Sequence, residues 1–215
     1  MYREKNTNLW CREDTLDEYV VKEQATYTPI FENMKGKVVA DIGANIGAFT
    51  YNSLKHGAKR VVAFEPDPDN IKIYKKQGFD ERVKLFEGAV SNVTGQATLY
   101  QNAKGKNKGL HSLQDISGRD MTEVNTYSFS KLLKKFEPEI LKIDIEGGEY
   151  MLDLYDLPEF VKGICIEIHL THKDNRRKGK ALAKSLEQQF PVVLKKPHIT
   201  EKNWTTLFIG LREEE

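Results

Sequence analysis

Short apolar runs alternate with longer amphipathic stretches along most of this chain, a pattern that indicates strands alternating with helices. Buried strands are predicted where Val, Ile, Leu and Phe cluster, at residues 37–42, 60–65, 83–86, 139–145 and 163–168. Helices are predicted between and after them, at residues 47–56, 67–77, 128–136, 149–155 and 176–190. This alternation favours an α/β protein whose parallel sheet is covered by helices on both faces.

The end of the chain departs from this alternation. Two further strands are predicted at residues 191–194 and 204–211, and the nine residues between them are too few for a helix. Such a short connection joins antiparallel strands, whereas parallel strands need a crossover of roughly a dozen residues or more. We therefore expect a Rossmann-like, doubly wound and mostly parallel sheet with an antiparallel last strand.

The length of the chain, 215 residues, suits a single domain, 1–215. Near its start, residues 14–34 show apolar positions at helical spacing, and Pro29 interrupts the pattern. We expect residues 1–35 to form an N-terminal helical cap over the core or the pocket.

A central segment also falls outside the strand–helix alternation. Residues 97–100 alternate like an edge strand, whereas residues 102–109 are rich in Lys, Gly and Asn. Residues 115–124 are polar and irregular. We expect residues 101–125 to form an insertion loop that faces the substrate.

Composition adds few constraints. Lys and Arg number 33 and Asp and Glu 32, so the net charge of +1 demands neither a nucleic-acid nor a membrane partner. Cys11 lies in a polar context and Cys165 in an apolar run, which argues against a disulfide between them. No signal core is present, and no apolar run approaches the ~18–20 residues of a membrane span. We expect a soluble, cytoplasmic protein, and the sequence leaves its oligomeric state open.

The first chemical motif follows the first buried strand, and its fixed residues are Asp41, Gly43, Asn45 and Gly47. The spacing is neither the dinucleotide fingerprint nor a phosphate loop. A carboxylate at this turn would repel a pyrophosphate but suits a ligand that carries a cation. S-adenosyl-L-methionine has a sulfonium and an amino group, so the motif points to this methyl donor, with an ordinary strand–helix turn as the alternative.

Two further positions fit an adenosine ligand. Glu65 ends the second strand, where an acidic residue can accept both ribose hydroxyls, and Pro66 offers a rigid apolar edge to the adenine. After the third strand, the small residues around Ala89 allow a flat base to lie against the backbone. Alone, Glu65 could simply precede a helix, and Ala89 could belong to a plain turn.

The second chemical motif ends the fourth strand and places Asp144, Glu146 and Glu149 within six residues. Carboxylates this dense beside a cleft are costly unless they bind cations, accept protons or meet donors. Asp144 is expected to face the methyl group or the nucleophile. Glu146 and Glu149 could instead pair with basic residues or cap the following helix.

His169 ends the fifth strand and is a candidate general base for a hydroxyl, because its ordinary pKa is near neutrality. Asp144, Glu167 and His169 follow adjacent strands, so a divalent metal is possible, but we predict none. No paired His or Cys spacing indicates a structural metal. The alternative is a histidine at the pocket rim that is satisfied by a hydrogen bond.

These motifs together, DIGANIGAFT, FEPDP, GAVSN, LKIDIEGGEY and ICIEIH, resemble the FkbM-type methyltransferases over residues 36–170. The resemblance implies a class I S-adenosylmethionine-dependent enzyme with a sheet of about seven strands and a reversed last strand. It implies that the methionine part is held by Asp41, Gly43, Asn45 and Gly47, the ribose by Glu65 and the adenine edge by Ala89. It also implies O-methylation, often of a sugar or polyketide hydroxyl.

We therefore expect an O-methyltransferase that acts on a hydroxyl of a sugar, a glycan or a small molecule, with Asp144, His169 and Glu146 as catalytic residues. The alternative is an RNA methyltransferase, in which lysines of the insertion and the cluster at residues 176–180 contact phosphates. A third possibility is a binding module that kept the fold without catalysis. The absence of a D/N-P-P-Y/F string argues against methylation of a base amine.

Overall fold

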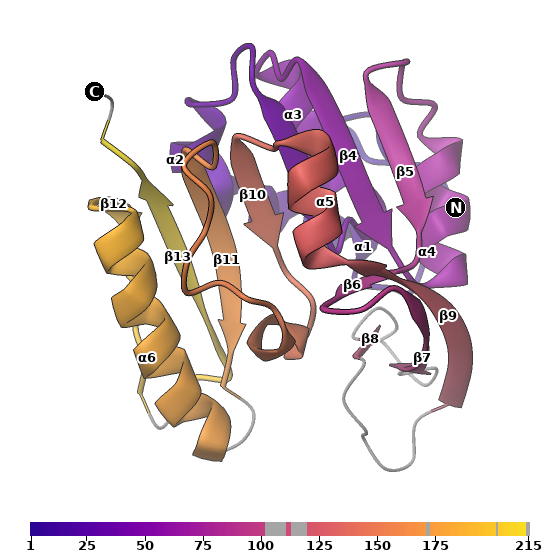
Figure 1. Cartoon of the computed structure of the whole chain (residues 1–215). Coiled ribbons are helices and arrows are strands. Elements are labelled where there is room, and N and C mark those ends of the chain that lie inside the picture. The colour runs from indigo at the N-terminus through magenta and orange to yellow at the C-terminus, as the bar shows by residue number, and fades with distance from the viewer. Residues whose placement is uncertain (102–110, 113–119, 171–172, 201, 214–215) are drawn as a thin grey trace.

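A seven-stranded sheet forms the centre of the computed structural model, which describes residues 1–101, 111–112, 120–170, 173–200 and 202–213 (Figure 1). Across the sheet the strand order is β12-β13-β11-β10-β3-β4-β5. Along the chain the strands are β3 (Val38–Ile42), β4 (Arg60–Glu65), β5 (Val83–Glu87), β10 (Ile140–Ile143), β11 (Gly163–His169), β12 (Val192–Lys195) and β13 (Thr205–Leu211).

The direction of the strands confirms the predicted fold class. The five strands from β5 to β11 are parallel, and β13 pairs antiparallel with both β11 and β12. The parallel strands are β-branched and apolar because both faces of the sheet are covered. The strand order changes direction between β3 and β10, so their carboxyl ends open onto a crevice.

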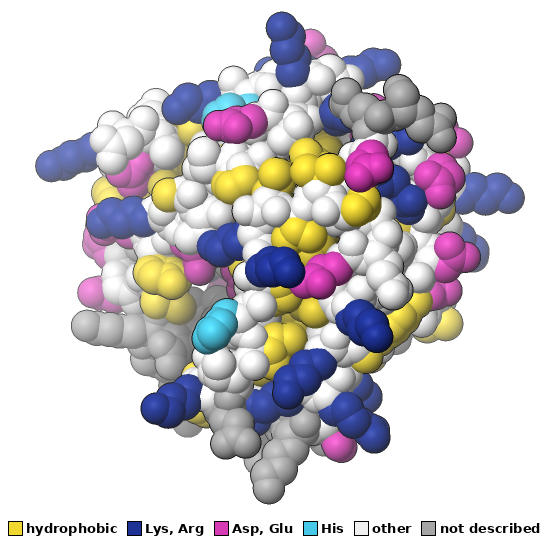
Figure 2. Space-filling view, turned by 90° about the vertical axis from the view of Figure 1, so that its left-hand side faces the viewer, with side chains coloured by type: hydrophobic (Ala, Val, Ile, Leu, Met, Phe, Trp, Pro, Cys, Tyr) yellow, Lys and Arg dark blue, Asp and Glu magenta, His cyan; other side chains and the backbone are white. Residues whose placement is uncertain are grey.

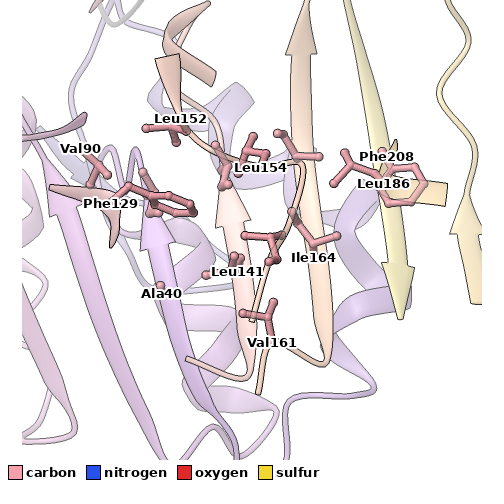
Figure 3. Close-up of a cluster of buried hydrophobic side chains, with 14 of the residues drawn as sticks. Ala40, Val90, Phe129, Leu141, Leu152, Leu154, Val161, Ile164, Leu186 and Phe208 are labelled. Carbon is pink, nitrogen blue, oxygen red and sulfur yellow. The ribbon is translucent and has the colours of Figure 1, made fainter. Parts of the chain in front are cut away.

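Helices cover both faces of the sheet, and four of them are α3 (Ala48–Lys55), α4 (Pro68–Lys76), α5 (Phe129–Phe136) and α6 (Lys173–Gln189). Figure 3 shows the apolar cluster on one face, where Leu141 and Ile164 of the sheet pack with Phe129 of α5 and Leu186 of α6. On the other face a second cluster includes Phe49 of α3. The helix predicted at 149–155 is only a 3₁₀ turn, η2 (Gly148–Met151).

The N-terminal segment is helical only in part. A short hairpin of β1 (Tyr2–Arg3) and β2 (Trp10–Cys11) comes first, so the helical part of the cap expected at residues 1–35 begins only after it. The helical elements that follow are α1 (Asp17–Glu23), η1 (Gln24–Tyr27) and α2 (Thr28–Phe31). Pro29 lies in the first turn of α2, where proline is compatible with a helix, rather than interrupting one. Cys11 and Cys165 are both buried free thiols.

A second sheet lies beside the carboxyl ends of β4 and β5 (Figure 1), with strand order β6-β9-β7-β8. Its strands are β6 (Ala89–Ser91), β7 (Gly95–Gln101), β8 (His111–Ser112) and β9 (Asp120–Ser128). Residues 120–124 are therefore extended rather than irregular, because β9 pairs with the whole of β7 and buries Val124. The rest of the expected insertion loop, at 102–110 and 113–119, lies outside the described residues.

Among the described residues, no helix combines the length and the apolar character that a membrane crossing requires.

Candidate functional site

A cleft lies at the carboxyl ends of β3, β4 and β10. Seven of the predicted site residues line it, namely Gly43, Asn45, Glu65, Pro66, Ala89, Asp144 and Glu146. The sequence did not single out six other lining residues, Phe64, Asn70, Val90, Leu99, Ile145 and Gly148. Asp41, Gly47 and His169 are not among the residues that line it, and each has a different place in the structure.

Gly43 permits the ends of β3 and β10 to meet. Its backbone has φ +81°, and a Cβ at this position would lie 1.8 Å from the carbonyl oxygen of Asp144. Gly47 has φ +93° and directly precedes α3, and a Cβ there would lie 2.7 Å from the Phe79 ring. Gly47 therefore allows the turn to pack against Phe79 and does not itself face the cleft.

Glu65 is fixed by backbone and side-chain donors from both sides of the cleft. Its Oε2 accepts the Asn45 backbone N–H (2.7 Å), and its Oε1 accepts the Asp67 N–H (2.9 Å) and Asn70 Nδ2 (3.2 Å). Burial raises the pKa of Glu65 to about 7, because desolvation outweighs these hydrogen bonds. A carboxylate offers about four lone-pair directions, so a further donor can still bind here.

The wall beside Glu65 is apolar. Phe64 of β4, Ala89 and Val90 of β6 and Leu99 of β7 line this part of the cleft. Ala89 is only 6% exposed, and Leu99 comes from the second sheet, so that sheet completes the wall. An apolar wall beside a carboxylate suits a flat ring that is attached to a hydroxylated group.

Asp41 lies behind the cleft and is fully buried. Its Oδ2 accepts the Thr50 hydroxyl (2.7 Å), and its Oδ1 lies 3.5 Å from Lys142 Nζ. The Lys142 ammonium also donates to the Gly43 carbonyl and lies 3.6 Å from Asp144 Oδ2. Burial alone would lower the pKa of Lys142, but Asp144 and Asp41 outweigh it and raise this pKa above its ordinary value. Lys142 is thus a buried cation that joins the two motifs.

Lys142 was not singled out in the sequence, although a signal was present. It is a charged residue in the middle of an apolar strand that is buried on both faces. Lysine is almost never fully buried unless it is paired. Such a position predicts a buried carboxylate on a neighbouring strand, which here is Asp41 of β3, opposite Lys142 in the register.

His169 is more than nine-tenths buried and lies between two carboxylates. Its Nε2 is 3.3 Å from Glu146 Oε2, and its Nδ1 is 3.4 Å from Glu149 Oε1. Burial would lower the pKa of His169, but the two carboxylates raise it well above its ordinary value. These carboxylates argue against His169 as a neutral general base, a role that stays a prediction, because an imidazole that holds its proton cannot accept another. Glu149 also accepts the His169 backbone N–H (2.6 Å).

Carboxylates from several elements gather beyond Asp144. Glu167 of β11 accepts the Tyr27 hydroxyl (2.8 Å) and faces the Thr205 hydroxyl (3.4 Å). Burial and the negative charges of Asp144 and Glu23 raise the pKa of Glu167 to about 7. Burial and Asp144 likewise raise the pKa of Glu23 on α1. This side of the site is therefore acidic, and its carboxylates repel one another.

Asp144, Glu167 and His169 also have the donor types of a metal site. One potential ligand atom from each lies within 4.8 Å of the others. The Lys142 ammonium already faces Asp144, and the ring of His169 lies against Glu146, which is outside this group of three. A divalent ion would have to compete with the Lys142 ammonium for Asp144, so we assign no metal to this cluster.

Comparison with known proteins gives a family match. The family model of the methyltransferase FkbM domain matches residues 41–193 of this chain. A comparison with curated proteins found no significant match.

Solved structures resemble this chain at low sequence identity. The chain resembles precorrin 8w decarboxylase from Methanobacterium thermoautotrophicum, with 14% identity and a TM-score of 0.50 over 98% of this chain and 97% of that one. For precorrin-6y C5,15-methyltransferase from Geobacter metallireducens the identity is 12% and the TM-score 0.47, over 99% and 98%. For magnesium protoporphyrin IX methyltransferase from Synechocystis PCC 6803 with bound SAM, the identity is 8% and the TM-score 0.48, over 97% of this chain and 88% of that one. These likenesses concern the fold alone.

Proposed function

Since the chain belongs to the FkbM methyltransferase family and is an S-adenosylmethionine-dependent methyltransferase, we propose that it methylates a hydroxyl group of a sugar, a glycan or another small molecule. The observation that carries this proposal is the acidic side of the site around Asp144, Glu146 and Glu167. Carboxylates accept hydrogen bonds from hydroxyl groups and repel phosphates. An uncharged, hydroxylated acceptor therefore suits this position.

The cofactor is assigned to the cleft. Glu65 has room for a further donor such as a ribose hydroxyl, and the apolar wall with Ala89 and Leu99 suits the adenine. The turn at Gly43 and Asn45, with Asp144, is assigned to the methionine part. S-adenosyl-L-methionine supplies a methyl group activated by a sulfonium. Asp41 acts indirectly in this proposal, because it holds Lys142 against the Gly43 carbonyl.

The acceptor proton is assigned to Asp144 rather than to His169. Asp144 lines the cleft and its side chain is 30% exposed, so it can reach an acceptor hydroxyl. His169 is a positioning residue, since its imidazolium orients Glu146 at the edge of the cleft. Holding the hydroxyl in line with the methyl group then supplies much of the rate enhancement.

A methyl-transfer screen with labelled cofactor tests the proposal, using glycans, small alcohols and RNA, each with and without a chelator. We expect label in a neutral hydroxylated acceptor, and no loss of transfer with the chelator. Asp144→Asn should lower transfer by a larger factor than it lowers cofactor affinity, whereas the exposed control Glu159→Gln should keep both. Transfer to RNA alone would reject the proposal.

RNA methylation is the second candidate, and the observation that favours it is the basic outer face of α6. Its exposed cations Arg177, Lys180 and Lys184 are not among the residues that line the cleft. A phosphate flanks every ribose of RNA, and would therefore approach Asp144 and Glu167 closely. This repulsion ranks RNA below a neutral hydroxyl acceptor.

A further inference from the structure

Positive charge is concentrated in one part of the chain that the proposed reaction does not use. Residues 173–204 contain nine Lys and Arg against three Asp and Glu, a net charge of +6 where the whole chain has +1. Figure 2 looks onto the side of the molecule that α6 and β12 form. Dark-blue side chains gather in the lower half of this view, with few magenta ones among them.

The helix α6 orders part of this charge into a stripe. Arg177, Lys180 and Lys184 are exposed and recur at three- and four-residue spacing, so they share one face and span about 10 Å. The opposite face packs Leu182 and Leu186 into the core. No described carboxylate lies within ion-pair distance of these three cations. The helix therefore fixes the spacing of three positive side chains that are exposed to solvent and accessible to a ligand.

An exposed aromatic side chain belongs to the segment that runs from a contact with α6 to the end of β11. Trp204 is 75% exposed, and its carbonyl accepts the Leu170 N–H at the end of β11. The next residue, Thr205, faces Glu167. Earlier in the same segment, the Thr200 carbonyl accepts a hydrogen bond from Arg176 Nε on α6 (3.4 Å). Thr200, which contacts α6, and Thr205, which faces Glu167, are five residues apart in the chain, so their Cα atoms are at most about 18 Å apart.

We propose that this surface, Trp204 with the stripe Arg177–Lys180–Lys184, binds an anionic glycan chain whose uncharged hydroxyl is presented to the acidic side of the cleft. The inference rests on the proposed function and specifies its acceptor. The acidic side requires a neutral reacting group, and the stripe requires negative groups farther along the same molecule. An exposed indole provides the flat apolar surface on which a sugar ring packs. RNA fits less well, because its charges cannot be kept away from the ribose.

Binding is tested without cofactor, with three fluorescently labelled ligands: a hyaluronan oligosaccharide, in which uncharged sugars alternate with uronates, a neutral dextran oligosaccharide and oligouridylate. Anisotropy is measured at several salt concentrations. We expect hyaluronan to bind with an affinity that falls steeply as salt rises, and dextran to bind far more weakly. The double variant Arg177→Glu with Lys180→Glu should weaken hyaluronan binding at least tenfold. Trp204→Ala should weaken it at high salt, where the charges are screened.

The matched control reverses two exposed lysines on α5, Lys131→Glu with Lys134→Glu, and so changes the net charge equally. It should bind hyaluronan within about twofold of the parent. Failure of hyaluronan to bind, an equal loss in the two double variants, or tighter binding of oligouridylate at every salt concentration would overturn the inference. Calorimetry with S-adenosylmethionine on the same variants separates failure of this inference from failure of the proposed function. Cofactor binding does not involve the stripe, so the variants should bind the cofactor like the parent even if no glycan binds.

Discussion

The contact between Gly43 and Asp144 gives a prediction about how tightly the two motifs are coupled. In Gly43→Ala the new methyl group would lie 1.8 Å from the Asp144 carbonyl oxygen, which belongs to backbone and cannot rotate away. The ends of β3 and β10 would have to separate. Because both residues line the cleft, the variant should lose stability and cofactor affinity together.

The magnitude follows from two terms. A residue with a Cβ in the left-handed region, here φ +81°, costs about 1–2 kcal/mol. Forcing an extra methyl group into a packed site adds about 1–3 kcal/mol. Gly36 isolates the first term, because its φ is +76° and a Cβ there would meet nothing within 4 Å. We therefore expect roughly 1–2 kcal/mol for Gly36→Ala and about 2–5 kcal/mol for Gly43→Ala.

Urea unfolding followed by circular dichroism measures both free energies, and calorimetry measures cofactor affinity. Gly36→Ala should keep that affinity, since Gly36 lies at the opposite end of β3 from the cleft. Equal losses of stability in the two variants would show that the Gly43 contact is not tight and would refute the reasoning.

Two further predictions concern buried charges. Removing the cation in Lys142→Met leaves Asp41 without its ion-pair partner and should cost about 3–5 kcal/mol. Adding Asp41→Asn to Lys142→Met should recover at least about 1 kcal/mol of the free energy of unfolding, because no buried carboxylate is then left unpaired. If urea unfolding shows that the losses of the two single variants simply add, the two residues do not interact as an ion pair. The raised pKa of His169 means that the folded state holds this proton more tightly than the unfolded state. Stability should therefore fall as pH rises above about 6.5 and through the folded pKa, and His169→Gln should remove this component. If the urea midpoints of the parent protein and of His169→Gln depend on pH in the same way, this prediction is contradicted.

The positions of most central strands could be predicted from the sequence. The run Arg60–Glu65 matches β4 to the residue, because an apolar β-branched segment bounded by polar residues has few alternatives in a parallel sheet. Asp67 was a predicted start of α4, and its side chain caps the helix by accepting the Asn70 N–H. The second sheet was harder to predict, since β9 has one largely exposed face and pairs with residues of β7 that are 19 to 31 positions away.

The site was predictable where function depends on residues close in sequence. Gly43, Asn45 and Asp144 line the cleft because strand ends and turns are local features. The sequence could not show that Asp41 faces inward or that two glutamates flank His169, since both depend on which neighbouring strand supplies a charge. The hydrogen bond from Tyr27 to Glu167 joins positions 140 residues apart and has no local signal.

Calorimetric titration with S-adenosyl-L-methionine, comparing the parent protein with Glu65→Gln and Glu87→Gln, tests the central assignment most directly. The two glutamates are register partners at the ends of β4 and β5, but Glu87 is exposed and paired with Lys75. A hydrogen bond to a charged group contributes about 1.5–3 kcal/mol, so Glu65→Gln should weaken binding by roughly tenfold or more. Glu87→Gln should bind like the parent. No binding by the parent protein, or equal affinities in all three proteins, would contradict the assignment of this cleft to the cofactor.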